Sequence, residues 1–173
     1  MKTINSINMK RNASSRKAIL GSLLVISLLL CSSVSSAQSP VNFSGTWIQD
    51  TTKSDDFYKK FDVIYAITQT PQVFTVKQTF AIKGSKEAVI RDYSFTLDGK
   101  VTNHKKEYGI EKNLAQWSPD KKILNTRSVV TYGSQDVGYT ETYSLSTNGR
   151  VLTIQKTDII PGSKPLKQVF NKR

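Results

Sequence analysis

Cysteine is almost absent from this sequence, and its absence excludes several kinds of site. The one cysteine, Cys31, lies in an apolar segment near the N-terminus of the 173-residue chain. Beyond Ala37 the sequence has none, so that part of the chain forms no disulfide. It also offers no thiol nucleophile and no thiolate metal site.

Histidine is equally scarce, which argues against several kinds of catalysis. The single histidine, His104, stands among Asn, Lys and Glu residues, as is typical of a protein surface. One histidine cannot supply a two-histidine metal site. The G-x-S-x-G turn of many serine hydrolases and the glycine-rich phosphate loop are also missing. We therefore expect no enzyme, no metal and no cofactor; a hydrolase would need a cleft that gathers His104 with an acid.

The N-terminal segment has the three parts of a secretory signal peptide. An apolar run, Ala18 to Leu30, is followed by the small residues Ser35-Ser36-Ala37. We expect cleavage after Ala37, and thus a signal peptide at 1–37, a domain at 38–173 and a periplasmic or extracellular protein. Lipid anchoring through Cys31 is the less favoured alternative, since Leu30 before it is not small. The basic residues that precede the apolar run are Lys2, Lys10, Arg11, Arg16 and Lys17.

The charge of the chain is positive but dispersed. Beyond residue 37, 20 basic and 13 acidic residues remain, a net charge of +7. The excess occurs in pairs such as Lys59-Lys60 and Lys121-Lys122, which are typical of strand ends and turns. We therefore expect no nucleic-acid partner, whereas weak association with an anionic envelope surface stays open.

Alternating apolar and polar residues predict an all-β fold. The expected strands are 43–49, 62–69, 73–82, 88–97, 100–108, 114–117, 123–132, 138–145, 151–158 and 166–172. Asp98-Gly99 and Asn148-Gly149 predict hairpin turns. Between the first two strands, Ser54 to Phe61 predicts a short helix that Ser54 caps. An antiparallel up-and-down meander that closes into a barrel of 8–10 strands is favoured, with a two-sheet sandwich as the alternative.

Four stretches resemble the lipocalin and calycin superfamily. FSGTW at 43–47 resembles its G-x-W opening strand. YSFTLDGK at 93–100, AQWS at 115–118 and ETYSLSTNGR at 141–150 are similar to small exported bacterial lipocalin-like proteins of unassigned function. The resemblance implies a barrel that binds a small apolar molecule. It also implies closure at Gly45 and Trp47, with Lys172 or Arg173 over the indole, and a lid in the first loop that would carry Phe57, Tyr58 and Phe61.

The predicted inward faces carry polar residues among the apolar ones, and these are the candidate ligand-binding groups. They are Gln78, Arg91, Tyr93, Tyr139, Glu141 and Tyr143. In this hypothesis the Arg91 guanidinium holds a carboxylate or phosphate, and the tyrosines supply walls and hydroxyls. The alternative is an internal Arg91–Glu141 ion pair, or a face that points outward.

Two functions follow, and the barrel interior distinguishes them. The first is an exported, non-enzymatic protein that binds a small apolar or amphipathic ligand inside the barrel. The second is an interaction or envelope protein, such as an inhibitor or structural partner, whose barrel is filled. A cavity of a few hundred Å³ favours the binder. The large residues that would fill a small barrel are Tyr65, Phe74, Phe80, Tyr93, Phe95 and Tyr143.

Overall fold

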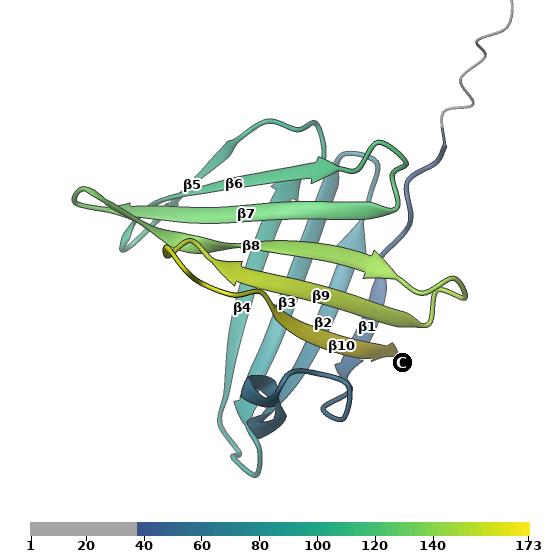
Figure 1. The fold of residues 1–173 in the computed structure, drawn as a ribbon. Helices are drawn as coiled ribbons and strands as arrows, with labels where there is room; N and C mark the ends of the chain where they lie inside the picture. The colour runs from purple at the N-terminus through teal and green to yellow at the C-terminus, as the bar shows by residue number, and fades with distance from the viewer. Residues whose placement is uncertain (1–37) are drawn as a thin grey trace, which may run out of the picture. The chain divides into compact units, whose positions relative to one another are not determined.

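The computed structural model describes residues 38–173, which form ten antiparallel strands and one 3-10 turn (Figure 1). The predicted signal peptide, its cleavage site and Cys31 lie outside the described residues. Within 38–173 no helix is long and apolar enough to cross a membrane. The elements are β1 (Gly45–Gln49), η1 (Asp56–Lys60), β2 (Phe61–Gln69), β3 (Val73–Ile82), β4 (Ala88–Thr96), β5 (Thr102–Lys106), β6 (Gly109–Trp117), β7 (Ile123–Tyr132), β8 (Gln135–Leu145), β9 (Val151–Asp158) and β10 (Leu166–Lys172).

The strands follow one another around the sheet in chain order. Consecutive strands pair antiparallel from β1 to β4 and from β5 to β10, and β1 pairs with β10. Trp47 on β1 lies opposite Lys172 on β10 and opposite Tyr65 on β2. The predicted up-and-down barrel is confirmed, and the sandwich alternative is wrong because all ten strands form one continuous sheet.

A gap remains between β4 and β5, which are the two ends of the sheet. The hairpin predicted at Asp98-Gly99 is therefore wrong. Its turn does form, since Gly99 has φ +74° and the N–H of Lys100 donates to Asp98 Oδ1 over 3.0 Å. The flanking strands do not pair, and the N–H of Leu97 donates instead to the carbonyl of Gln72, over 2.8 Å.

Trp47 closes one end of the barrel. Its ring is fully buried, and its Nε1–H donates to the carbonyl of Phe43 over 2.9 Å. Lys172 Nζ lies 5.1 Å from the ring, within reach of a cation–π interaction. Gly45 leaves room for this lysine, because a Cβ there would lie 2.8 Å from Lys172 Cε. Arg173 is exposed, and its main-chain N–H donates to the carbonyl of Thr46.

The first loop contains the predicted helical segment as the single 3-10 turn η1. The expected cap is wrong: Asp55 precedes the turn, and no side chain caps it. Ser54 faces β10 instead. Its Oγ donates to the carbonyl of Asp50 over 2.8 Å and accepts the N–H of Val169 over 3.0 Å. The hydroxyl thus fastens the loop to the last strand and is unavailable to η1.

Candidate ligand-binding site

The half of the barrel next to Trp47 is packed solid. Phe74 lies in this half with Phe43, and their ring centroids are 6.1 Å apart. Tyr143 packs against Phe74 at 5.2 Å. The side chains that are less than 2% exposed here are Phe43, Trp47, Phe74, Phe95, Leu124, Tyr143, Leu152, Ile154 and Phe170. This half therefore has the interior that the filled-barrel alternative requires.

The other half is lined by polar side chains and contains open space. A pocket of about 300 Å³ lies inside it, which is within the range of small-molecule sites. Its walls combine the aromatic residues Phe57, Tyr58 and Phe80 with polar groups. The polar residues that line it are Tyr65, Gln78, Arg91, Lys156, Asp158, Lys164 and Gln168. The large residues predicted to fill the barrel thus fill only one half of it.

Glu141 is buried at the boundary between the two halves. Tyr143 Oη–H donates to Glu141 Oε2 over 2.5 Å, and Lys156 Nζ lies 3.9 Å from Oε1. Burial raises the pKa of the carboxyl group despite the nearby ammonium group. Lys156 Nζ also sits 3.6 Å from the centre of the Tyr139 ring. The lysine is therefore held in place by both neighbours.

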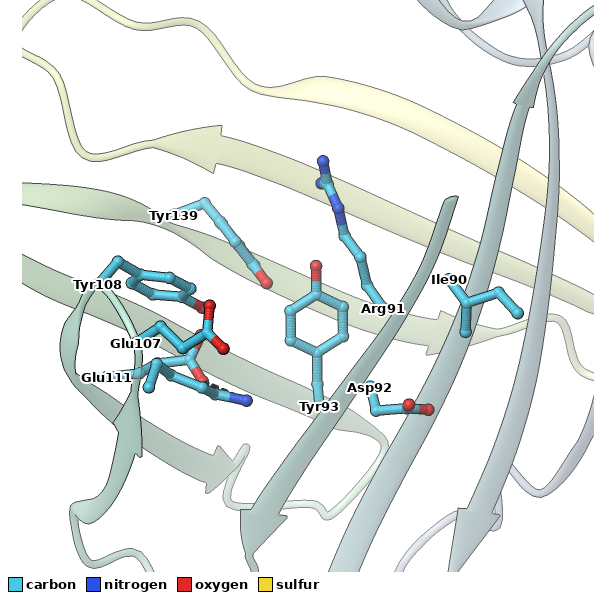
Figure 2. A pocket seen from close by; sticks show the side chains of 9 residues that line it. Ile90, Arg91, Asp92, Tyr93, Glu107, Tyr108, Glu111 and Tyr139 are labelled. Atoms are coloured by element: carbon cyan, nitrogen blue, oxygen red, sulfur yellow. Dashed lines mark ion pairs between the residues drawn. The ribbon is translucent and has the colours of Figure 1, made fainter. Parts of the chain in front are cut away.

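Arg91 stands at the mouth of this polar half. It is exposed, yet it lines the 300 Å³ pocket and a second pocket of about 610 Å³ beside β4. Figure 2 shows Arg91 next to Tyr93, whose hydroxyl points toward that of Tyr139. The predicted alternative of an Arg91–Glu141 pair is wrong, because the cation beside Glu141 is Lys156. No ion pair of Arg91 occurs within residues 38–173.

The tyrosines of the site are neutral hydroxyls at ordinary pH. Burial raises the pKa of Tyr93 and Tyr139 above 10, and that of Tyr58 to about 12. Burial also raises the pKa of Tyr65. Its hydroxyl accepts a hydrogen bond from Gln78 Nε2 over 3.2 Å. Each hydroxyl can therefore donate a hydrogen bond as well as accept one.

The predicted lid residues surround the opening of the pocket. Phe57 is half exposed and Tyr58 is buried, and both line the pocket. Phe61 is the first residue of β2 and packs against Phe80, with ring centroids 4.4 Å apart. Lys60 Nζ lies 5.0 Å from the Phe57 ring. Whether this loop opens and closes stays a prediction.

Exposed apolar side chains gather at the same end of the barrel. They come from η1 and from the ends of several strands around the mouth. These residues are Phe57, Ile82, Val89, Ile90, Tyr108, Ile110, Tyr132, Val137 and Ile160. Of these residues Phe57 lines the 300 Å³ pocket, and Ile90 and Tyr108 line the 610 Å³ pocket.

Sequence reasoning missed four polar residues of the site, which are Lys156, Asp158, Lys164 and Gln168. Lys156 and Asp158 share a face with Leu152 and Ile154, and extending that alternation to the end of the strand would have found them. Gln168, which is 3% exposed, follows the same rule on β10. His104, expected at the surface, is half-buried with its Nε2 enclosed. Residues 38–173 hold no group of three or more side chains able to bind a metal.

Comparison with known proteins identifies the fold. No family model and no curated protein matches the chain. Among solved structures, secretory abundant heat soluble protein 4 from Ramazzottius varieornatus matches with a TM-score of 0.55 and 13% identity, over 79% of this chain and 99% of that one. Human cRBP IV matches with a TM-score of 0.51 and 17% sequence identity, over 78% of this chain and 100% of that one. The chain has a lipocalin-like barrel fold.

A third structure has the same architecture. The REP1-NXSQ fatty acid transporter matches with a TM-score of 0.50 and 12% identity, over 75% of this chain and 95% of that one. At such identities the likeness concerns the fold alone. What this barrel binds has to be argued from its own side chains.

Proposed function

We propose that this protein is an exported, non-enzymatic carrier that binds one small amphipathic molecule in the open half of its barrel. The observation that carries the proposal is the 300 Å³ pocket, which combines aromatic walls with a guanidinium group that has no ion pair among the described residues. The apolar part of the ligand would pack against Phe57 and Phe80. Its head group would reach Arg91.

The charges of the pocket favour an anionic head group. Arg91, Lys156 and Lys164 line it, against the carboxylate of Asp158. Glu141 does not line the pocket, and burial raises the pKa of its carboxyl group. A planar guanidinium group binds a carboxylate or phosphate through two parallel hydrogen bonds. Support of a weaker kind comes from the fold, since one structure with this architecture is named a fatty acid transporter.

A pair of fluorescent probes tests the role of Arg91. Anilinonaphthalene sulfonate carries an anionic head group, whereas Nile red is uncharged. We expect Arg91→Ala to weaken binding of the sulfonate by about tenfold or more while Nile red still binds, because only the sulfonate loses charged hydrogen bonds. Arg127→Ala, on the exposed face of β7, is the matched control and should leave both unchanged. Unchanged sulfonate binding by Arg91→Ala would refute the assignment.

Native mass spectrometry of protein purified from its own host tests the carrier function itself. A stoichiometric extra mass that organic solvent extracts would support the proposal and identify the ligand class. A ligand-free mass, together with no uptake of either probe, would favour the filled-barrel interaction protein instead. The packed half around Phe74 and Tyr143 is the feature that keeps this second function under consideration.

A further inference from the structure

The gap between β4 and β5 forms a further hollow, which shares no lining residue with the 300 Å³ pocket but borders the 610 Å³ pocket beside β4. A groove of about 540 Å³ lies there, lined on one side by Lys77 and Asp92 and on the other by His104, Lys106 and Asn113. We call it the gap groove. Asn113 spans it, because its Nδ2–H donates to the carbonyl of Ser94 on β4 over 3.2 Å. This side-chain contact joins β6 to β4 where no backbone ladder does.

Two enclosed polar atoms beside the gap groove have no partner. Asn113 is 1% exposed, and its Oδ1 makes no hydrogen bond within residues 38–173. The same holds for His104 Nε2. In the β5–β6 register Asn113 faces Thr102, two residues from His104, so the two side chains are diagonal neighbours on one face. Enclosed polar atoms nearly always have a partner, so this pair of unpartnered atoms on one face is the most unusual feature beside the groove.

The charges around the gap groove are balanced, in contrast to those of the 300 Å³ pocket. Two lysines, Lys77 and Lys106, line it together with two carboxylates, Asp92 and Glu111. Glu111 is already engaged, since Ser128 Oγ–H donates to its Oε1 over 3.0 Å and Lys106 Nζ lies 3.8 Å from Oε2. Both donors and acceptors therefore line the groove, without an excess of either charge. Hydroxyl groups, which both donate and accept, match such a wall better than an anion does.

We propose that the gap groove binds a neutral polyhydroxylated molecule of the monosaccharide class, through hydrogen bonds to Asn113 Oδ1 and His104 Nε2. One ligand hydroxyl donates to the amide oxygen, and a second donates to, or accepts from, the imidazole nitrogen. The ammonium of Lys77 and the carboxylate of Asp92 lie at the same groove for further hydroxyls. The site is independent of the proposed carrier function, because Arg91 does not line this groove.

The single histidine makes the test direct, since its ring signals in an NMR spectrum can come only from His104. The purified protein is titrated with D-glucose, D-galactose and D-mannose, and with acetate as an anion control. We expect at least one sugar to shift the His104 ring signals and the Asn113 side-chain amide signals in a saturable way. Acetate should not shift them. If no sugar gives a saturable shift, the groove holds water only and the proposal is wrong.

Variants then place the site by calorimetric titration with the sugar that binds. His104→Phe and Asn113→Leu should each weaken binding by about tenfold, the effect of losing one buried hydrogen bond. Asn103→Ala, the exposed neighbour on β5, is the matched control and should bind like the wild type. Binding in the 300 Å³ pocket is measured separately with the two fluorescent probes, so failure of the carrier proposal leaves this one standing. Full affinity in His104→Phe, whose half-buried site tolerates a ring, would overturn the proposal even if Asn113→Leu does not fold.

Discussion

At the scale of single residues, two glycines show how closely the strands approach one another. Gly45 has φ +142° and leaves the space that the Lys172 side chain uses to reach Trp47. Gly138 has no such backbone requirement, yet a Cβ built on it would lie 2.0 Å from the carbonyl oxygen of Ser128 and 2.9 Å from Val129 Cα. The atoms it would meet are backbone atoms of β7, which cannot rotate away.

Gly138→Ala should therefore be among the most damaging small substitutions in the chain. We expect it to lower the free energy of unfolding by about 3 kcal/mol, because β7 and β8 must separate to admit the methyl group. Gly133→Ala is the matched control. A Cβ at Gly133 would have no neighbouring atom within 4 Å. Because its φ of +58° is unfavourable for alanine, we expect Gly133→Ala to lower the free energy of unfolding by only about 1 kcal/mol. Urea unfolding of both variants measures the difference, and equal losses would contradict the close approach of β7 and β8.

At the scale of elements, the first loop is held by β10 and not by its own 3-10 turn. Ser54 is 5% exposed and connects Asp50 to Val169 through its hydroxyl. Asp55 adds a second link, since its Oδ2 accepts the N–H of Lys167 over 2.7 Å. The wall of the pocket that Tyr58 forms therefore depends on contacts made more than one hundred residues later in the chain.

Ser54→Ala tests this attachment. We expect a loss of about 2 kcal/mol in the free energy of unfolding, because the buried N–H of Val169 would be left without an acceptor. Ser134→Ala, an exposed serine in the β7–β8 turn, should change the free energy by less than about 0.5 kcal/mol. Chemical denaturation followed by tryptophan fluorescence gives both values. A Ser54→Ala protein as stable as the wild type would show that the loop is held elsewhere.

The same elements show what the sequence could and could not predict. Period-two alternation placed Gln78, Tyr93 and Glu141 on inward faces, because that pattern depends only on neighbours along a strand. Asn148-Gly149 joins two strands that pair, whereas Asp98-Gly99 has the same turn chemistry and joins two that do not. The difference arises from long-range contacts, in which β4 ends by bonding to Gln72.

Ion-pair partners were equally hidden from the sequence. The alternation of residues along the strands allows Glu141 to pair with any cation on a neighbouring inward face, including Arg91. The β8–β9 register instead puts Lys156 directly opposite Glu141. Register depends on loop lengths and on the packing of the whole barrel, so such a choice follows from the assembled sheet and not from one strand's pattern. The enclosed Nε2 of His104 is hidden for the same reason, since it depends on how β5 lies beside the gap.

At the scale of the whole molecule, the barrel is divided into a packed half that supplies stability and an open half that contains unusual charges. The packed half buries its large side chains completely, as expected of a stable core. The boundary between the two halves keeps a carboxyl group, Glu141, at 6% exposure. Polar groups that give up stability for a task are typical of functional sites. The pH dependence of unfolding should reveal this division.

Glu141 should make the protein less stable as the pH rises from acid toward neutral. Its folded pKa is raised by burial above the ordinary value of 4.5, so the folded state holds a proton that the unfolded state has released. This contribution is fully present below about pH 4.5 and is lost as the pH rises through the folded pKa. Four aspartates act oppositely, because hydrogen bonds lower their pKa values below 3.8 and their contribution is lost as the pH falls. They are Asp50, Asp56, Asp98 and Asp120.

Comparing Glu141→Gln with the wild type isolates the buried group from these aspartates. The amide stays neutral and can still accept the hydrogen bond from Tyr143, so the decline that begins near pH 4.5 should be absent in the variant. Urea unfolding at a series of pH values gives the two curves, which should diverge in the variant's favour as the pH rises. Glu87→Gln removes an exposed carboxylate and should run parallel to the wild type. If the Glu141→Gln curve also ran parallel, Glu141 would be ionised in the fold and held by Lys156, and the anionic head group proposed at Arg91 would face a second negative charge.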